Sequence, residues 1–396
     1  MRNNRKLMSI FCILTFFALL LTACGSNEKG KTAGTGKAEG AQAKGKDWAK
    51  DNKINDTESA DELYEKAKKE GKVVVYAKGS KFKDVKTSFE AKYPGIKVEP
   101  YKIDRLEIQE KLKREHDAGV HNADLVHTAV EPGLVEGGYI HPYKPSDILE
   151  KFYDDYKDAE YPVHYLTVNP IIYNTEAYDK APISNWWDLT DPEWKGKILL
   201  NDPVSDASYS ELFVTIVQNA DEMAEAYKEK YGKEIELKEK NAGYEFIARF
   251  IKNDPVLMSS GEDIIESIGQ PGQKNPPIGF ASSSKLRHVE QSDLPIEGIF
   301  DIKPRISVKS SSVLYIADQA PHPNAAKLLA RWAMGEADGK AEGLEPFNLY
   351  GSWVPRTDVE NPNKIPADAL KTWDLDQAFY DKTFPEFRNF WIAKFN

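Results

Sequence analysis

The stretch KVVVYAKGSKFKDVKTSFEAKYPGIKVEPYKI, residues 72–103, decides the fold class. It opens with KVVVYA, a short β-branched run that suits a strand buried on both faces. The next part, KDVKTSFEAKYPG, places Val85, Phe89 and Tyr93 about four residues apart, which is helical spacing, and the Pro-Gly pair at 94–95 ends it. IKVEPYKI is a second short strand. We therefore predict a strand, a helix and a second strand in this stretch.

The same alternation continues on both sides of this stretch. Downstream, RLEIQEKLKREHDAG (105–119) has the apolar spacing of a helix, and ADLVHTA (123–129) has the pattern of a buried strand. Upstream, SADELYEKAKKEGK predicts a helix that Ser59 or Asp61 caps and that Gly71 ends. Strands that alternate with helices at this spacing indicate a parallel sheet in an α/β domain.

The first 23 residues have the composition of a secretory signal peptide. MRNNRK is basic, and the apolar run from Leu7 to Leu21 is shorter than the roughly 20 residues of a confident membrane span. Leu21-Thr22-Ala23-Cys24 resembles the lipobox of bacterial lipoproteins. This resemblance implies that residues 1–23 are removed, and that Cys24 is lipidated and anchors the chain to the cell membrane, facing the outside of the cytoplasm. An ordinary cleaved signal with a chance cysteine is the alternative.

Loss of the signal peptide would also set the cysteine content and the charge of the mature chain. The only other cysteine, Cys12, lies inside the apolar run, so the mature chain would have no disulfide, no thiolate metal site and no catalytic cysteine. Removal of three bases and no acids would move the formal net charge from −10 to −13. An acidic chain argues against a nucleic-acid partner. Residues 24–58, rich in Gly, Ala and Lys, predict a flexible linker behind the lipidated cysteine.

Several stretches resemble the family 1 extracellular solute-binding proteins of ABC importers, and in particular their ferric-ion-binding branch. VVVYA, FEAKYPGIKVE and ADLVHT resemble the opening of these proteins, and NPIIYNTEA resembles their crossover strand. NWWDLTDPEWKGKILLNDP resembles their W-x-D-L-x-D-P-x-W-K-G-K stretch, and APHPNAAKLLARWAMGEADGKA resembles their late helix with its HPNAA motif. The resemblance extends from about Lys72 to Arg356.

This resemblance implies a two-lobed periplasmic-binding-protein fold of type II. Each lobe would be a mixed, mainly parallel α/β sheet flanked by helices, and hinge strands would join the lobes. We expect lobe one to comprise residues 59–165 and 302–345, and lobe two to comprise residues 166–301 and 346–396. The implied function is the capture of a small solute between the lobes and its delivery to an ABC transporter permease. We expect a monomer that needs no cofactor.

Five loops at predicted strand ends are the candidate binding loops. In open α/β sheets, ligands bind outside the carboxyl ends of the strands, near helix N-termini whose unpaired N–H groups favour anions. The loops AKGSK, DRLE, HTAVE, NDPVSDASYSE and GFASSSKLRH fall at such places, and Lys81 and Tyr209 lie in two of them. Serine and glycine in a loop are often only turn residues. The candidate ligand-binding residues are Lys78, Gly79, Ser80, Arg105, His127, Thr128, Ser205, Ser208, Ser282, Ser283 and Ser284.

The same loops argue against an iron site. Ferric-binding relatives are expected to use a His or Gln after the first strand, a Glu after the third strand and adjacent tyrosines in the second lobe. This chain has Lys78-Gly79-Ser80 after the first strand, Ala129 where the glutamate would align, and no Tyr-Tyr pair. His127 and Glu131 could rebuild a metal site, but the nearby lysines would oppose a trivalent cation. We therefore expect no metal and predict an anionic solute, namely an organophosphate such as a sugar phosphate, a phosphonate or a small carboxylate.

Other patterns leave alternatives open. Arg105 or Arg287 could clamp a phosphate or carboxylate through two parallel hydrogen bonds, or could be solvated surface charges. Trp186, Trp187 and Trp194 could form a sugar-stacking platform, although packing of their loop against the second lobe is favoured. A secreted hydrolase is disfavoured because no G-x-S-x-G, H-E-x-x-H or P-loop pattern occurs, so we predict no enzymatic activity. Iron or other metal transport, and ligand sensing through a membrane kinase, are the remaining alternatives.

Overall fold

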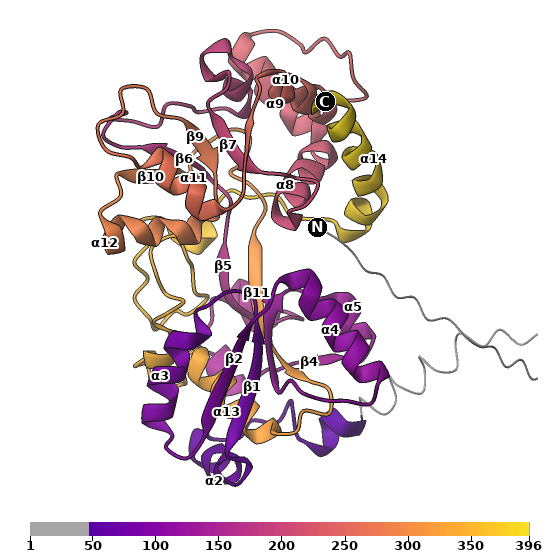
Figure 1. The fold of residues 1–396 in the computed structure, drawn as a ribbon, viewed down its shortest axis with the longest axis vertical. Helices are drawn as coiled ribbons and strands as arrows, with labels where there is room; N and C mark the ends of the chain where they lie inside the picture. Colours follow the sequence, from indigo (N-terminus) through magenta and orange to yellow (C-terminus); the bar gives the residue numbers. More distant parts are fainter. Residues whose placement is uncertain (1–46, 396) are drawn as a thin grey trace, which may run out of the picture.

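A computed structural model describes residues 47–395, which form two α/β lobes placed one above the other (Figure 1). The predicted signal peptide, Cys24 and the linker as far as residue 46 lie outside the described residues. Two strands, β5 (Val163–Thr167) and β11 (Ser310–Ala317), lie where the lobes join. The predicted two-lobed α/β fold is confirmed. Among residues 47–395, no helix combines the length and the apolar character needed to cross a bilayer.

The first lobe is built on a six-stranded sheet of order β2-β1-β3-β11-β4, with β5 paired to β11. The predicted strands β1 (Lys72–Ala77), β2 (Lys97–Lys102) and β3 (Leu125–Ala129) run parallel. Strand β11 runs antiparallel to β3, to β4 (Ile140–Pro142) and to β5. Because β1, β2 and β3 are parallel, their carboxyl ends meet at one edge of the sheet, and this edge faces the second lobe.

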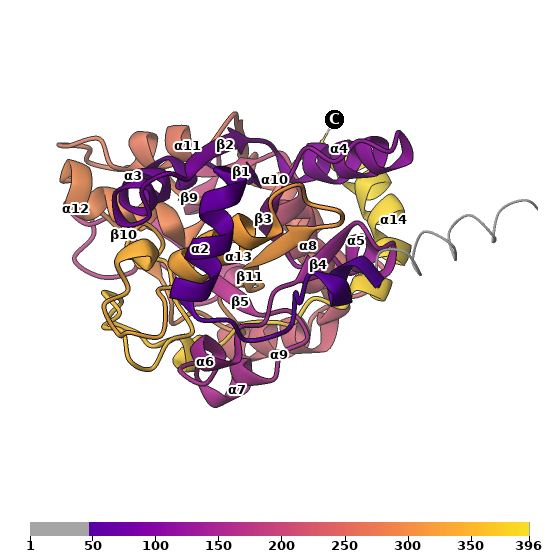
Figure 2. The same ribbon diagram turned by 90° about the horizontal axis from the view of Figure 1, so that it is seen from below.

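Helix α2 (Ala60–Glu70) begins and ends where the sequence predicts. The Ser59 hydroxyl accepts from the Glu62 N–H, the Glu62 carboxylate accepts from the Ser59 N–H, and Gly71 ends the helix at a φ of 75°. Helix α2 packs against α13 (Pro323–Ala333), which in turn packs on β1, β3 and β11 (Figure 2). The other helices of this lobe are α3 (Phe82–Lys92), α4 (Arg105–Asp117), α5 (Pro132–Glu136), α6 (Ser146–Leu149), α7 (Asp154–Lys157) and η4 (Glu342–Leu344).

The second lobe is built on a five-stranded sheet of order β10-β6-β9-β7-β8. Strand β7 is parallel to both of its neighbours, and β6 is antiparallel to β9 and β10. The strands are β6 (Ile171–Asn174), β7 (Ile198–Asn201), β8 (Val256–Met258), β9 (Ile278–Phe280) and β10 (Ile296–Ile299). The helices are η1 (Trp186–Thr190), η2 (Pro192–Trp194), α8 (Ala207–Gln218), α9 (Ala220–Tyr231), α10 (Ala242–Lys252), α11 (Gly261–Ile268), η3 (Ser283–Arg287), α12 (His288–Ser292), η5 (Ala367–Ala369) and α14 (Gln377–Phe395).

The tryptophans of the second lobe lie in its hydrophobic core. Trp186 and Trp187 are fully buried, and Trp194 is nearly so. The Trp186 ring stacks on Phe280 with a centroid distance of 5.4 Å, and its Nε1 donates to the Arg305 carbonyl at 2.7 Å. Burial of these rings confirms the packing interpretation and argues against the sugar-stacking platform, because all three rings pack within the core of the second lobe.

The folded body begins earlier than the predicted residue 59. Residues 47–58, which we assigned to the linker, include a helical turn and pack on the first lobe. Ile54 is fully buried, and the Glu58 carboxylate forms an ion pair with Lys327 of α13. The segment is mostly polar, and its three apolar packing residues, Trp48, Ala49 and Ile54, are too few to mark a folded segment by composition.

The later lobe boundaries also differ from the prediction. Ile302 and Ile306, which we assigned to the first lobe, pack in the core of the second, so the return to the first lobe begins with β11. Phe347 and Val354, which we assigned to the second lobe, pack in the core of the first. Segments that pass between two cores are apolar on both sides of the crossing, so hydrophobicity alone does not mark where the crossing occurs.

Candidate functional site

A cleft of about 800 Å³ lies between the two lobes. In the first lobe its walls are the loop that follows β1, the start of α3 and the end of β2, and in the second lobe they are the segments that follow β7, β8 and β9. Strands β5 and β11, together with residues 345–349, complete the lining. The cleft therefore occupies the carboxyl ends of parallel strands in both lobes, which is where ligands bind in open α/β sheets.

Cationic side chains from both lobes converge on this cleft. The positively charged residues that line it are Lys78, Lys81, Lys102, Lys285 and Arg287. The carboxylates that line it are Asp84, Asp206, Glu262 and Glu345. Asp206 is already engaged, because its carboxylate caps α8 by accepting from the Ser208 N–H at 2.9 Å and from the Asn201 amide at 3.1 Å.

Lys81 lies at the start of α3, directly after the loop that follows β1. Gly79, in that loop, adopts a φ of 95°, a backbone conformation that glycine adopts readily. The Lys81 ammonium lies 4.7 Å from the ring centroid of Tyr165 and 5.3 Å from that of Phe347. The Nζ atom is buried and has no hydrogen-bond partner. Burial, followed by the charges of Arg287 and Lys285, lowers the pKa of Lys81 to about 7.

Lys285 and Arg287 share one carboxylate, that of Glu262 at the start of α11. The Lys285 ammonium pairs with Glu262, and Arg287 Nη2 lies 3.6 Å from the same carboxylate. Burial would raise the pKa of Glu262, but the hydrogen bond and charge of Lys285 outweigh burial and lower it. Arg287 Nη1 donates to the Ser284 carbonyl at 2.7 Å, which holds the guanidinium against its own loop. The pair is thus held in place at the wall of the cleft.

Small polar groups complete the lining. Ser282 and Ser284 face each other, with their hydroxyl oxygens 3.0 Å apart. Each hydroxyl can donate one hydrogen bond and accept others, and each amide can do both, so such a lining suits a solute rich in oxygen. The hydroxyl and amide side chains are Ser80, Thr167, Asn169, Asn201, Ser208, Ser282, Ser284, Gln291, Ser310 and Ser312.

The structure brings together part of the predicted set. The predicted residues that line the cleft are Lys78, Gly79, Ser80, Ser208, Ser282 and Ser284. The predicted residues that do not line it are Arg105, His127, Thr128, Ser205 and Ser283. The lining residues missed by sequence reasoning include Lys102, Tyr165, Thr167, Asn169, Asn201, Ser310 and Ser312. Lys102 stands at the end of a predicted strand, so the strand-end rule could have found it, whereas the residues of β5 and β11 carry no such signal.

Arg105 joins the two lobes through carboxylates and is not available as a clamp. Its Nε lies 2.7 Å from Glu131 of the first lobe, and its Nη1 lies 2.8 Å from Glu211 in α8 of the second lobe. Burial acts to lower the pKa of Arg105, but the charges of Glu211 and Glu131 raise it. Arg105 does not line the cleft, and its guanidinium is held by two carboxylates and the Val130 carbonyl. Its ligand-binding role stays a prediction that this geometry does not support.

His127 and Thr128 are buried behind the cleft and do not reach it. His127 packs against Phe82 and Phe347, and burial lowers its pKa well below the usual value. His164 donates from Nε2 to the Ala333 carbonyl at 2.7 Å, so its Nδ1 accepts from His127 Nε2 at 3.3 Å. Burial lowers the pKa of His164 to about 3. Both imidazoles are therefore neutral and form part of the packing.

Ser283 and Ser205 also have structural surroundings. The Ser283 hydroxyl donates to the Gly351 carbonyl at 2.5 Å and accepts from the Val168 N–H at 3.1 Å. Ser205 is exposed, and its hydroxyl donates to the Asp202 carbonyl at 3.3 Å within the same turn. Side chains in a run of three serines cannot all point the same way, so the middle one faces the protein.

We expect Ser283→Ala to lower stability and Ser284→Ala to weaken solute binding. Ser283→Ala leaves the buried Val168 N–H without an acceptor, so the free energy of unfolding should fall by about 1–3 kcal/mol. Ser284→Ala should leave stability within about 0.5 kcal/mol of wild type and weaken solute binding. Urea denaturation and ligand titration of the two single variants measure this. Equal stability of the two variants would contradict the assignment of Ser283.

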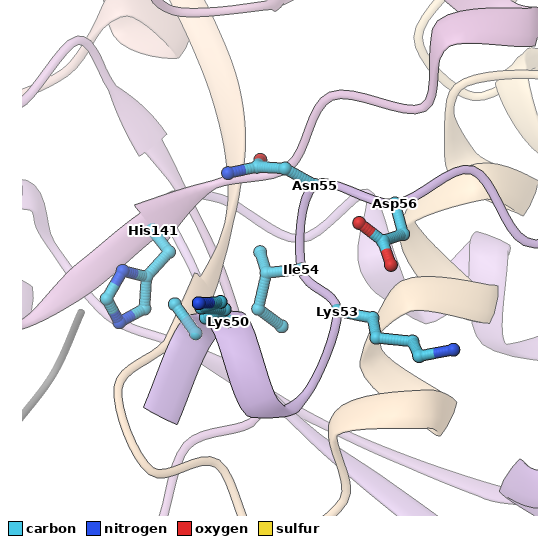
Figure 3. Close-up of a pocket in the computed structure, with 7 residues that line it drawn as sticks. Lys50, Lys53, Ile54, Asn55, Asp56 and His141 are labelled. Atoms are coloured by element: carbon cyan, nitrogen blue, oxygen red, sulfur yellow. The ribbon is translucent and has the colours of Figure 1, made fainter. Parts of the chain in front are cut away.

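No metal cluster is present in the described part of the chain. Residues 47–395 contain no group of three or more His, Cys, Asp or Glu side chains placed to hold a metal ion. A cavity of about 310 Å³ lies between residues 49–56 and β4, but Lys53 extends away from His141, with Ile54 between them (Figure 3). His141 is engaged by Asp318, with Nε2 2.9 Å from Oδ1. This cavity lacks the convergent polar groups of a binding site.

Comparison with known proteins identifies the family. Residues 84–372 match the family described as bacterial extracellular solute-binding protein, and this match spans well over half of the chain. The chain belongs to that family. Its members are solute-binding proteins of ABC transport, which bind small ligands and work with transporter permeases. Among curated proteins, none matches the chain by sequence.

Solved structures agree with the fold of this solute-binding protein. The periplasmic binding protein AfuA from Actinobacillus pleuropneumoniae, with fructose 6-phosphate bound, is 18% identical with a TM-score of 0.61, over 82% of this chain and 98% of that one. Iron-bound HitA from Pseudomonas aeruginosa is 14% identical with a TM-score of 0.60, over 82% and 99%. IdiA (FutA) from Trichodesmium, in complex with iron and citrate, is 18% identical with a TM-score of 0.56, over 82% and 99%. At these identities the likeness shows the fold alone.

Proposed function

We propose that this solute-binding protein captures a small anionic solute in the interlobe cleft and delivers it to an ABC transporter permease. The solute class is an organophosphate, a phosphonate or a small carboxylate. The observation that carries the proposal is the convergence of five cationic side chains from both lobes on one cleft of about 800 Å³. Hydroxyl and amide groups also line this cleft, together with four carboxylates, of which Asp206 and Glu262 are engaged by protein groups. Charge-assisted hydrogen bonds from lysine and arginine are the usual means of holding phosphate and carboxylate groups.

The cleft is less suited to ferric iron. Fe(III) is a hard cation that wants carboxylate and phenolate oxygens, whereas the ammonium of Lys81 lies against the face of Tyr165. The hydroxyl of Tyr209, the second tyrosine of the cleft, donates to the Phe280 carbonyl at 2.6 Å, and burial raises its pKa. Among the structural neighbours, AfuA has fructose 6-phosphate bound and HitA has iron bound, so the fold accommodates either class. The charge of this cleft favours the former.

The mechanism proposed is closure of two lobes around the solute, without chemical conversion. Strands β5 and β11 lie where the lobes join, and both contribute residues to the cleft. On closure, the side chains of β5 and β11 would move little, and the loops of the two lobes would approach the solute from either side. Closure would shift the population toward the form that the permease recognises. Lipidation of Cys24 would tether the monomeric protein to the outside of the membrane. Sensing through a membrane kinase would use the same closure, and uptake of labelled solute into vesicles that contain the permease distinguishes the two.

A thermal-shift screen of residues 47–396 tests the solute class. We expect fructose 6-phosphate, inorganic phosphate or citrate to raise the midpoint temperature, and glucose, an uncharged control, to leave it unchanged. A ligand at about 100 times its dissociation constant stabilises the folded state by about 2.7 kcal/mol, which is a rise of several degrees. Stabilisation by Fe(III) alone, with no response to any anion, would overturn the proposal in favour of iron transport. Native mass spectrometry of the purified protein would then name any retained solute.

A further inference from the structure

One ammonium group in the described part of the chain is buried without an acceptor. Within residues 47–395, Lys81 is the one lysine or arginine whose side-chain nitrogen is both buried and without a hydrogen-bond partner. Lys327 provides the contrast, because it is also buried but pairs with the Glu58 carboxylate and donates to the Asn52 carbonyl at 3.0 Å. Lys230 likewise pairs with both Asp188 and Asp191. This protein therefore satisfies its structural lysines and leaves Lys81 unsatisfied.

The surroundings of Lys81 offer positive charge and aromatic faces but no counter-ion. On its own loop lies Lys78, and from η3 come Lys285 and Arg287, whose charges act on Lys81. From β5 come Tyr165, whose pKa is raised by burial, and His164, which is neutral like His127 of β3. The carboxylates of the same cleft, Asp84 and Glu345, form no hydrogen bond with the Lys81 ammonium in the described structure. An uncompensated buried charge is costly, so its retention points to a ligand that completes it.

We propose, on the basis of the anionic solute inferred above, that Lys81 holds the anionic group of the solute and that the bound anion supplies the acceptor that its ammonium lacks. Lys285 and Arg287 lie on the facing wall and would contact the same group, with Glu262 occupying them in the empty cleft. The aromatic faces of Tyr165 and Phe347 hold the ammonium as a compact charge at a fixed place. Capture of the solute would therefore take up a proton at Lys81 when the empty protein is partly deprotonated.

The sign of the pH dependence follows from the lowered pKa of Lys81. Its pKa is about 7 in the folded protein and 10.5 as the ordinary value, so below about pH 7 both the folded and the unfolded chain carry the proton and the folded state bears the full cost of burying the charge. As pH rises from about 7 towards 10.5, the folded state loses the proton first and this cost is relieved. Anion affinity runs the opposite way, because only the protonated form holds the anion, and should fall about tenfold for each pH unit above about 7.

The test compares Lys81→Met with Lys83→Met, which removes the same charge from an exposed position on α3 outside the cleft. The probes are inorganic phosphate and sulfate, and sulfate keeps its charge across the pH range used. We expect Lys81→Met to raise the midpoint temperature of the solute-free protein by several degrees at about pH 6, and by less at about pH 9. We also expect it to weaken binding of both anions by tenfold or more. Lys83→Met should match the wild type in both measurements.

The outcomes separate this inference from the proposed function. If Lys81→Met binds phosphate and sulfate as the wild type does, Lys81 is not the anchor, although the solute remains anionic. If Lys81→Met loses binding and also destabilises the solute-free protein, Lys81 is a structural residue and the inference is wrong. If the wild type binds neither probe, the inference is wrong. The proposed function is also wrong if, in addition, no anion stabilises the protein in the thermal-shift screen. Higher solute-free stability together with lost anion binding is the result that supports the inference.

Discussion

Replacement of Arg105 by methionine is expected to lower the free energy of unfolding by about 3–5 kcal/mol, the usual result of removing one partner of a buried ion pair. Arg105 lies between Glu131 and Glu211, at 2.7 Å and 2.8 Å, and the Glu131 side chain is only 6% exposed. Methionine cannot donate to either carboxylate, so Glu131 would keep a buried negative charge with only Gln109 and Thr128 as donors. Urea denaturation measures the change.

Glu211→Gln is the matched variant, because it alters only the contact that crosses between the lobes. The amide oxygen of the new side chain can still accept from Arg105, and the Arg105–Glu131 pair remains, so the loss should be about 1 kcal/mol. Small-angle X-ray scattering of both variants adds a second readout, since the loss of an interlobe contact should increase the radius of gyration of the Arg105→Met protein. If Arg105→Met keeps wild-type stability and loses anion binding, Arg105 is a solute ligand after all.

Replacement of Trp186 by alanine should also lower the free energy of unfolding by about 3–5 kcal/mol, as is usual for a large buried ring. Trp186 is fully buried, stacks on Phe280 at 5.4 Å and lies 6.1 Å from Trp373 between ring centroids. Its removal leaves a cavity in the core of the second lobe and an unpaired carbonyl at Arg305. Thermal unfolding followed by circular dichroism measures the loss.

Trp186→Phe is the control for the tryptophan prediction. Phenylalanine keeps a stacking ring but not the indole N–H, so most of the packing remains and the loss should be clearly smaller. Because Trp186 does not line the cleft, solute affinity below the unfolding transition should match the wild type in both variants. Weaker binding of an uncharged sugar by a stable Trp186→Ala protein would revive the stacking platform.

The architecture was predictable because its local signals agree with one another. The β-branched run at 72–77, the helical spacing of Val85 and Phe89 and the strand at 125–129 each have the right length and period. The two strands are neighbours in one sheet. Parallel strands place their carboxyl ends together, so the position of the cleft followed from the order of the elements. The lobe boundaries were less predictable, because residues such as Ile302 and Phe347 are apolar whichever core they join.

Site residues were predictable by loop but not by side-chain direction. The loops after β1 and β9 do line the cleft, yet within the second of them Ser282 and Ser284 face the cleft and Ser283 faces Gly351. Arg105 stands at a strand end as expected, but its partner Glu211 lies 106 positions later in the chain. A pairing over that distance depends on how the lobes are placed, which no short motif records. The lack of a hydrogen-bond partner for the buried Lys81 ammonium likewise depends on how the lobes are placed, so the sequence alone does not show it.

The packing of residues 47–58 decides which lobe a membrane tether at Cys24 would hold. Ile54 and the Glu58–Lys327 pair fix this segment to the first lobe. A linker that begins at a lipidated Cys24 would therefore attach to the first lobe. Its stretch of about 22 residues reaches at most about 80 Å when fully extended. The first lobe would then be the lobe attached to the membrane, and the second lobe would move relative to it when the cleft closes. Opening and closing of the cleft would then leave the extension of the linker unchanged, and the cleft would stay free to turn toward the permease.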